Sequence, residues 1–271
     1  MNLHLSAIYI YPIKSLGGFS VDSARVEERG LQHDRRWMLV DADNNFLTQR
    51  NHPQLASLQV SLPGDELVIT HKTTLDQISI PQEPQTSEVL RVKVWSDTCR
   101  AVAASPVADA WFSGFLGQPC RLVYMPDTTK RRVDARYAVA DNHTSFSDGY
   151  PFLLIGQASL DDLNGRLAEP LPMNRFRPNL VVSGGEPYAE DNWHELQVGE
   201  STFFGVKACS RCIMTTTDQK TGETGREPLK TLAAYRKRGN KILFGQNMVF
   251  GRTGDRISVG DGVRVHSLRG K

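Results

Sequence analysis

The stretch Arg36-Trp37-Met38-Leu39-Val40-Asp41, followed by Asp43-Asn44-Asn45 and then Phe46-Leu47-Thr48-Gln49, indicates how this chain folds. Two short apolar runs separated by a polar turn are typical of a β-hairpin. Brief apolar runs bounded by turn residues recur in both directions along the chain. We therefore expect a protein built mainly of short strands.

The other predicted strands have the same character. The first, residues 5–11, is apolar with β-branched and aromatic side chains, and Pro12 ends it. Pro63-Gly64-Asp65 is a turn signal between two further runs. Outside the hairpin, strands are predicted at residues 5–11, 58–62, 66–70, 90–95, 179–182, 196–198, 202–206, 246–250 and 262–266.

Three helices interrupt the strands. Ser105 is a plausible helix cap, Pro106 suits the first helical position, and Gly117 ends the segment. A second helix is predicted from Ser159, with Asp161-Asp162 in its first turn, where the helix dipole favours acidic groups. A third is predicted at residues 229–235. The apolar residues that recur at helical spacing are Val107, Ala110, Trp111, Phe115 and Leu116 in the first helix, and Leu160, Leu163 and Leu167 in the second.

This mixture predicts the fold class. The strands are too scattered and too often bounded by turns for a doubly wound parallel sheet, so we expect an α+β fold of the β-barrel type with a few flanking helices. The polar stretch 126–141, which contains Lys130-Arg131-Arg132, is a candidate domain boundary or active-site loop. We predict one unit at residues 1–125 and a second at residues 126–271.

Bulk composition excludes several classes of protein. A chain of 271 residues can bury a good core, and 39% apolar with 23% charged residues is ordinary for a globular protein. The formal charge of +2 gives no reason to expect a nucleic-acid or membrane partner. The start of the chain, residues 1–5, lacks a basic segment followed by an apolar run. We expect a cytoplasmic protein that is neither secreted nor membrane-spanning.

Half of the four cysteines lie in Cys209-Ser210-Arg211-Cys212. The spacing allows a redox dithiol, half a zinc site, or one cysteine acting as ligand or nucleophile while Arg211 holds an anion. It also allows two buried cysteines without chemistry. Cys99 and Cys120 are isolated and do not complete a zinc pattern. No clustered cysteine run predicts an iron–sulfur cluster in this chain.

Cations beside turn residues are the second chemical signal. Lys14 and Ser15 follow the first strand and precede Gly17-Gly18, and similar clusters occur in Asp34-Arg35-Arg36-Trp37 and Asn174-Arg175-Phe176-Arg177-Pro178-Asn179. Cations and backbone N–H groups near glycines hold phosphates, although each segment taken alone is more often solvated surface charge. The turn Ser147-Asp148-Gly149-Tyr150-Pro151 could lend backbone amides to a ligand. No Walker, Rossmann or nucleophile-elbow pattern is present.

Taken together, these segments resemble a known family. The resemblance rests on Tyr11-Pro12-Ile13-Lys14-Ser15, Asp34-Arg35-Arg36-Trp37, Ser147 to Leu153, Asn174 to Gly184, Tyr188 to Trp193, Ala208 to Thr216 and Phe244-Gly245-Gln246-Asn247. Their order and number resemble the MOSC family (molybdenum cofactor sulfurase C-terminal domain), in particular the branch with the mitochondrial amidoxime reducing component and bacterial YcbX. The resemblance implies a MOSC N-terminal β-barrel region at 1–125 and a MOSC domain at 126–271.

The resemblance also implies a site. The family's molybdenum-ligating cysteine corresponds to Cys212, which would be the catalytic residue and metal ligand, with Cys209 as a neighbour. A soft thiolate is a fitting ligand for molybdenum already held by a dithiolene. Positions that match cofactor contacts or a turn near the cofactor are Lys14, Ser15, Arg35, Asp148, Gly149, Arg177, Asn179, Ser210 and Arg211.

The implied activity is a two-electron reduction of N-hydroxylated compounds, such as amidoximes and hydroxylaminopurines, on a molybdenum–molybdopterin cofactor. YcbX-like chains often continue into a ferredoxin-type domain, whereas this sequence stops at Lys271, so we expect a separate electron-donor protein. The basic loop Lys130-Arg131-Arg132 could dock that donor, line the substrate entrance or simply be solvated. The alternative function is a MOSC-type carrier of cofactor or sulfur without reductase activity.

Overall fold

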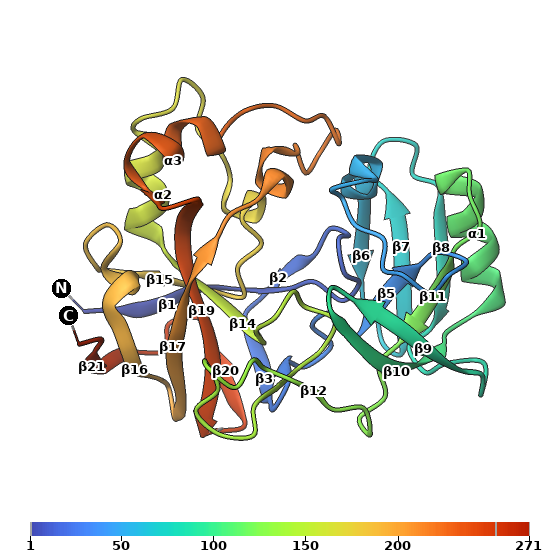
Figure 1. The fold of residues 1–271 in the computed structure, drawn as a ribbon, viewed down its shortest axis with the longest axis horizontal. Coiled ribbons are helices and arrows are strands. Elements are labelled where there is room, and N and C mark those ends of the chain that lie inside the picture. Colours follow the sequence, from blue (N-terminus) through green and yellow to red (C-terminus); the bar gives the residue numbers. More distant parts are fainter. Residues whose placement is uncertain (1, 253, 271) are drawn as a thin grey trace.

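One lobe of the protein is built on a nine-stranded sheet that combines strands from both ends of the chain (Figure 1). The computed structural model describes residues 2–252 and 254–270. The strand order is β2 (Phe19–Val21), β1 (His4–Ile10), β15 (Leu180–Ser183), β14 (Phe152–Gly156), β19 (Lys241–Arg252), β17 (Ser201–Ser210), β16 (Trp193–Val198) and β21 (Val263–Leu268), with β18 (Lys237–Arg238) paired to the start of β19.

This sheet curls towards closure. Its neighbouring strands are antiparallel except for the parallel pair β14–β15. His4 forms a bridge with Gly262, and the Leu5 amide donates to the Asp261 carbonyl at 2.9 Å, so β1 also lies beside the start of β21. A twisted sheet that curls in this way encloses its own apolar core. The predicted β-rich α+β fold class is confirmed.

The other lobe holds two smaller sheets. One has the order β5 (Trp37–Val40), β11 (Arg121–Tyr124), β10 (Asp97–Ala103) and β9 (Val89–Val94), and the other is β6 (Leu58–Ser61), β7 (Glu66–His71) and β8 (Gln77–Pro81). Alternation explains these strands: in β8, Ile78 and Ile80 are buried while the residues between and beside them are exposed. The core of this lobe also takes in Trp37 and Phe112.

Smaller elements complete the chain. A three-stranded sheet has the order β20 (Arg256–Ser258), β3 (Ser23–Glu27) and β4 (Gly30–Leu31), and β12 (Arg131–Arg132) pairs with β13 (His143–Thr144). The 3₁₀ helices are η1 (Pro53–Ser57), η2 (Met173–Arg175), η3 (Ala189–Asn192) and η4 (Ile213–Thr216). No helix in residues 2–252 and 254–270 is long and apolar enough to cross a membrane.

Two of the three predicted helices are confirmed closely. α1 (Pro106–Leu116) begins after Ser105, whose Oγ accepts from the Ala108 amide, and it ends at Gly117 with φ of 68°. α1 packs against β11 and β8 at the outer side of its lobe (Figure 1). α3 (Leu229–Tyr235) has the predicted bounds.

The second helix starts earlier than predicted. α2 (Gln157–Asn164) follows β14 directly, so the prediction that Asp161-Asp162 occupy its first turn is wrong. The buried Glu190 carboxylate takes over the role of a cap, accepting from the Gly156 amide at 3.1 Å and from Ser159 Oγ at 2.8 Å. The local sequence does not contain this partner, which lies 31 residues after Ser159.

The predicted strand at residues 46–49 is only partly formed. Phe46 forms an antiparallel bridge with Val40, and the Leu47 amide donates to the Leu39 carbonyl at 2.8 Å, so the hairpin is present but its second arm is short. β5 pairs along its full length with β11. The chain then leaves the sheet because Gln49 is buried and donates from Nε2 to the Ser15 carbonyl at 2.6 Å. The predicted division at residues 125 and 126 stays a prediction; in space, β1 to β4 lie with the strands of the second half.

Candidate functional site

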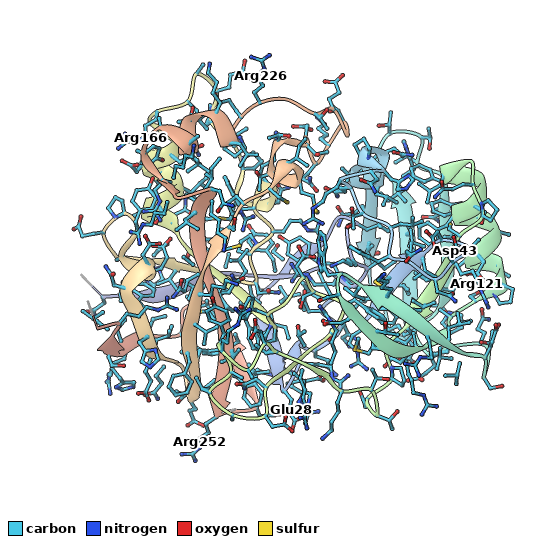
Figure 2. The ribbon with its side chains drawn as sticks, in the orientation of Figure 1. Glu28, Asp43, Arg121, Arg166, Arg226 and Arg252 are labelled. Atoms are coloured by element: carbon cyan, nitrogen blue, oxygen red, sulfur yellow. The ribbon has the colours of Figure 1, made fainter. Side chains whose placement is uncertain are left out.

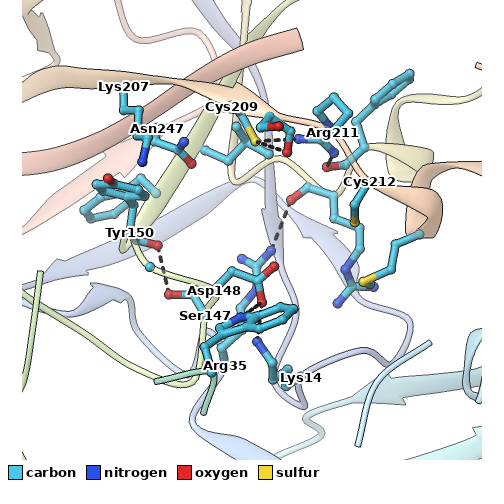
Figure 3. Close-up of a pocket in the computed structure, with 18 of the residues that line it drawn as sticks. Lys14, Arg35, Ser147, Asp148, Tyr150, Lys207, Cys209, Arg211, Cys212 and Asn247 are labelled. Carbon is cyan, nitrogen blue, oxygen red and sulfur yellow. Dashed lines mark hydrogen bonds and ion pairs between the residues drawn. The ribbon is translucent and has the colours of Figure 1, made fainter. Parts of the chain in front are cut away.

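A cavity of about 650 Å³ opens between the lobes and is lined by residues of both (Figure 3). Its volume falls in the range typical of small-molecule and cofactor sites. Residues from nine separate parts of the sequence reach it. All ten predicted site residues line it: Lys14, Ser15, Arg35, Asp148, Gly149, Arg177, Asn179, Ser210, Arg211 and Cys212.

The cavity wall is strongly basic. Nine lining residues are lysines or arginines, and three are aspartates, in a chain whose overall formal charge is only +2. Positive charge is therefore concentrated here rather than spread over the surface. Such a wall attracts an anionic ligand, and guanidinium groups suit phosphate and carboxylate oxygens in particular.

Backbone conformation sets this region apart as well. Nine non-glycine residues in the described part of the chain have positive φ, and four of them line the cavity: Ser15 at 69°, Arg35 at 50°, Trp95 at 56° and Arg177 at 56°. Residues held in this region cost free energy and persist only where the surrounding structure fixes them, which is common at functional sites. The backbone conformation at these four positions places their side chains in the cavity wall.

Lys14 and Asp148 form the ion pair at the base of the site. Lys14 is 5% exposed, and its Nζ donates to Asp148 Oδ1 at 2.6 Å and to the Phe146 carbonyl at 2.8 Å. Burial lowers the pKa of Lys14 to about 8, against the opposing effect of Asp148. Burial would raise the pKa of Asp148, but the neighbouring Lys14 and Arg50 hold it well below its usual range.

Arg35 and Arg177 form a pair of like charges. Their guanidinium carbons lie 4.5 and 4.3 Å from the centre of the Tyr11 ring, and Arg35 Nη2 donates to the Arg177 carbonyl. Arg35 Nη1 donates to Asp34 and to Asn179 Oδ1, so the buried Asn179 orients it. Burial, together with Arg35, lowers the pKa of Arg177 to about 10. A bound anion would relieve that repulsion.

The cysteine segment is the end of a strand followed by a tight loop. β17 ends at Ser210, the Arg211 amide donates to the Ile242 carbonyl, and Cys212 precedes η4. Arg175 fixes the far side of this loop, donating to the Thr216 carbonyl at 3.2 Å and to Asp218 Oδ2 at 2.8 Å. The loop therefore presents Cys212 at the cavity wall.

The two thiols have different neighbours. Cys209 Sγ accepts from Arg211 Nη1 at 2.9 Å, whereas Cys212 Sγ accepts from Arg50 Nη2 at 3.3 Å. All four cysteines are free, and no group of three or more His, Cys, Asp or Glu side chains gathers as a metal site within the described ranges. The structure thus supplies no second ligand pair for the zinc interpretation there.

The structure gives three further residues a central place in the cavity: Arg50 and Trp95, which sequence reasoning did not select, and Arg131, which it named only within the basic loop 130–132. Arg50 contacts Cys212 and Asp148, and Trp95 Nε1 donates to Asp148 Oδ1 at 3.2 Å. Arg131, 4% exposed, donates to the carbonyls of Ser145, Ser147 and Asp148 and so fixes the predicted turn. The possibility that residues 130–132 are simply solvated is therefore wrong for Arg131. Only the positive-φ position of Trp95 and the many partners of these residues mark them, and neither is visible in the sequence.

Fold and site together define a β-rich α+β protein whose two lobes enclose a cation-lined cavity with one thiol-bearing loop. Comparison with protein families matches residues 2–119 to the MOSC N-terminal beta barrel domain and residues 141–264 to the MOSC domain. The chain belongs to the MOSC family.

Its relatives carry two kinds of name. The chain is 36% identical over 279 residues to mitochondrial amidoxime-reducing component 1 of Homo sapiens, an alignment that covers 96% of this chain and 82% of that protein. The mouse protein of that name is 35% identical over 260 residues, covering 92% and 76%. The molybdenum cofactor sulfurase of Oryza sativa subsp. japonica is 35% identical over 264 residues, covering 90% of this chain but only 32% of that protein.

Proposed function

We propose that this protein is a molybdenum-cofactor-dependent oxidoreductase that reduces small N-hydroxylated compounds. The overall reaction is R–NH–OH + 2 e⁻ + 2 H⁺ → R–NH₂ + H₂O, with electrons from a separate donor protein. The observation that carries the proposal is a single cavity in which Cys212 and an excess of cations converge. The relatives named for amidoxime reduction, similar along most of their length, support the same reading.

The cavity fits a metal bound to an anionic organic group. A molybdopterin carries a phosphate, which needs several converging cations, and its metal needs one further soft ligand. Within residues 2–252 and 254–270, three buried guanidinium nitrogens of lining residues have no hydrogen-bond partner: Arg50 Nη1, Arg175 Nε and Arg211 Nε. Unsatisfied nitrogens in a cation-rich wall are what a missing anionic partner would leave.

In this proposal, different residues of the chain hold different parts of the cofactor. Arg35, Arg177 and Lys14 hold the anionic end of the cofactor, with Ser15 and the amides of the turn that contains Asp148 and Gly149 beside it. Asn179 orients Arg35 through its 3.0 Å hydrogen bond.

The cysteine loop supplies the rest of the proposed site. Cys212 ligates the metal, while Ser210 and Arg211 contact the cofactor. When bound, the molybdenum cofactor supplies the two-electron redox chemistry. Cys209 is predicted to be dispensable, because Arg211 occupies its sulfur.

The test compares two cysteine variants that differ only in position. Wild type, Cys212→Ala and Cys209→Ala are prepared in a host that makes the cofactor, and molybdenum, pterin and reduction of 6-hydroxylaminopurine by a chemical electron donor are measured. We expect loss of turnover in Cys212→Ala with an unchanged melting temperature, and retention in Cys209→Ala. Wild type that binds no molybdenum, or a Cys212→Ala variant that turns over, would contradict the proposal.

A cofactor or sulfur carrier is the second candidate, because the sulfurases are as similar to this chain as the reductases are. That function requires a sulfur acceptor rather than a metal ligand. A persulfide on Cys212 or Cys209, found by mass spectrometry in a protein without reductase activity, would favour it. The cytoplasmic location stays a prediction.

A further inference from the structure

Arg50 joins the two lobes at the cavity, and while its unpartnered Nη1 is one of the nitrogens that fit an anionic cofactor, its Nη2 has no role in the proposed function so far. It lies in the lobe of the small sheets, yet its Nη2 contacts two groups of the other lobe, Asp148 Oδ2 at 3.0 Å and Cys212 Sγ at 3.3 Å. The Arg50 side chain is 20% exposed. A single nitrogen of the Arg50 guanidinium therefore contacts both the Asp148 carboxylate and the sulfur predicted to be the metal ligand.

A second side chain fixes the orientation of that guanidinium. Arg50 Cζ lies 4.5 Å from the centre of the Trp95 ring, and the Trp95 indole donates to the same carboxylate, Asp148, at 3.2 Å. Trp95 stands in the two-residue turn between β9 and β10, since Val94 pairs with Asp97. Its φ of 56° is an uncommon conformation for an aromatic residue, and it directs the indole towards the cavity.

Neutralising Asp148 does not require Arg50. Lys14 already pairs with Asp148 Oδ1 at 2.6 Å, and Arg131 holds the backbone of the same turn through the Asp148 carbonyl. The additional guanidinium, stacked on an indole and partly buried, is a second cation at that carboxylate, where it helps to lower the pKa, and its Nη2 also reaches Cys212 Sγ. What it adds is a permanently charged donor beside Cys212 Sγ.

A hydrogen bond to a ligating sulfur changes the metal that the sulfur holds. It withdraws electron density from the thiolate, weakens its donation and shifts the reduction potential of the centre upward. It also limits the directions in which the sulfur can point. Residues with this role are found around metal ligands generally, and losing one typically costs ten- to hundredfold in activity or metal affinity.

We propose that Arg50, clamped by Trp95 and Asp148, is a positioning residue that hydrogen-bonds Cys212 Sγ and thereby sets the reduction potential of the metal bound there. This inference rests on the proposed function. It assigns a role in tuning the metal to a residue of the lobe of the small sheets, and it makes the contact between the lobes part of the active site. Arg50 acts through Cys212, so substrate affinity is not its target.

The experiment uses cofactor-loaded wild type, Arg50→Gln, Arg50→Lys, Trp95→Ala and the control Arg121→Gln. Arg121 is also paired with a carboxylate, Glu88, but lies on the outer side of the same lobe and does not line the cavity (Figure 2). Molybdenum per chain, the midpoint potential from an EPR-monitored titration, kcat and KM for 6-hydroxylaminopurine, and the melting temperature are measured.

Arg50→Gln should shift the midpoint potential downward and lower kcat about tenfold, with KM within about twofold of wild type. Trp95→Ala should move both quantities in the same direction by less, Arg50→Lys should lie between wild type and Arg50→Gln, and Arg121→Gln should match wild type. Partial loss of molybdenum from a stably folded Arg50→Gln also supports the role. If Arg50→Gln does not fold, Trp95→Ala decides the question.

The inference is overturned if Arg50→Gln, or Trp95→Ala in its place, keeps molybdenum, potential and kcat, or changes KM alone. In that case an active wild type leaves the proposed function standing. Wild type without molybdenum or turnover removes the proposed function and this inference together, and that result is read from the wild-type sample alone.

Discussion

The buried lysine at the base of the cavity leads us to predict how the free energy of unfolding changes with pH. Lys14 is 5% exposed, and burial lowers its pKa from an ordinary 10.5 to about 8. The folded protein therefore holds the Lys14 proton less tightly than the unfolded chain does. Between pH 8 and 10.5 the unfolded state binds more protons at this position, so the free energy of unfolding must rise with pH.

The size of the effect follows from the two pKa values. Each pKa unit is worth about 1.4 kcal/mol, so the full difference amounts to about 3 kcal/mol. Below pH 8 most of the penalty is present, and above pH 10.5 most of it is gone. From pH 7 to pH 10 the contribution of Lys14 should change by about 2 kcal/mol in favour of the folded state.

The assay is urea unfolding of wild type and Lys14→Met at half-unit steps from pH 7 to pH 10. The partly buried Lys72, whose pKa burial also lowers to about 8, is common to both proteins, and its contribution cancels in the difference. The wild-type free energy of unfolding minus that of Lys14→Met should climb steadily with pH. If this difference in free energy stays flat or falls with pH, the folded protein does not hold the charged Lys14 side chain in an unfavourable environment. The argument that the cavity is prepared to bind an anion would then lose this support.

Two further predictions concern the frame of the site. Arg131→Met should lower the free energy of unfolding by about 3 kcal/mol, because it removes a buried cation that donates to three carbonyls and one carboxylate. The control is Arg132→Met at the neighbouring, 74% exposed side chain, which should change the free energy of unfolding by less than about 0.5 kcal/mol. Equal effects of the two substitutions in urea titrations would contradict this. Gly245→Ala should cost at least about 2 kcal/mol, since its φ is 79° and a Cβ would lie 2.7 Å from a side-chain carbon of β14. Gly239→Ala, at φ 58° in open space, should cost about 1 kcal/mol, and a Gly245 variant no worse than this control would be the contrary result.

The local architecture was predictable because local patterns decide it. The helix at α1 is specified by a Ser-Pro start and a glycine stop, and β6 and β7 by short apolar runs on either side of a turn signal. Other strands, such as β8, β10, β11 and β14, were not predicted. Two of the failures share one cause. α2 begins early because a distant carboxylate, Glu190, caps it, and the second arm of the hairpin is short because Gln49 contacts the Ser15 carbonyl. Partners remote in sequence overrode the local preference in both places.

The candidate site divides in the same way. By itself, the sequence determined which segments carry cations and thiols, and the order of those segments led to the family that the comparisons then established. All ten predicted residues line one cavity, although their individual roles stay predictions. Those residues could be selected because the segments that carry them match the motifs of the family.

Only the tertiary structure decided how these groups act on one another. Lys14 and Asp148 are 134 residues apart, and Arg50 and Cys212 are 162 apart, yet each pair is in contact. Two features depend on how the lobes pack together. One is the burial that lowers the pKa of Lys14, and the other is that Arg50 contacts Cys212 while Arg211 contacts Cys209. Desolvation and hydrogen-bond geometry depend on neighbours in space, so no pattern along the chain encodes them locally.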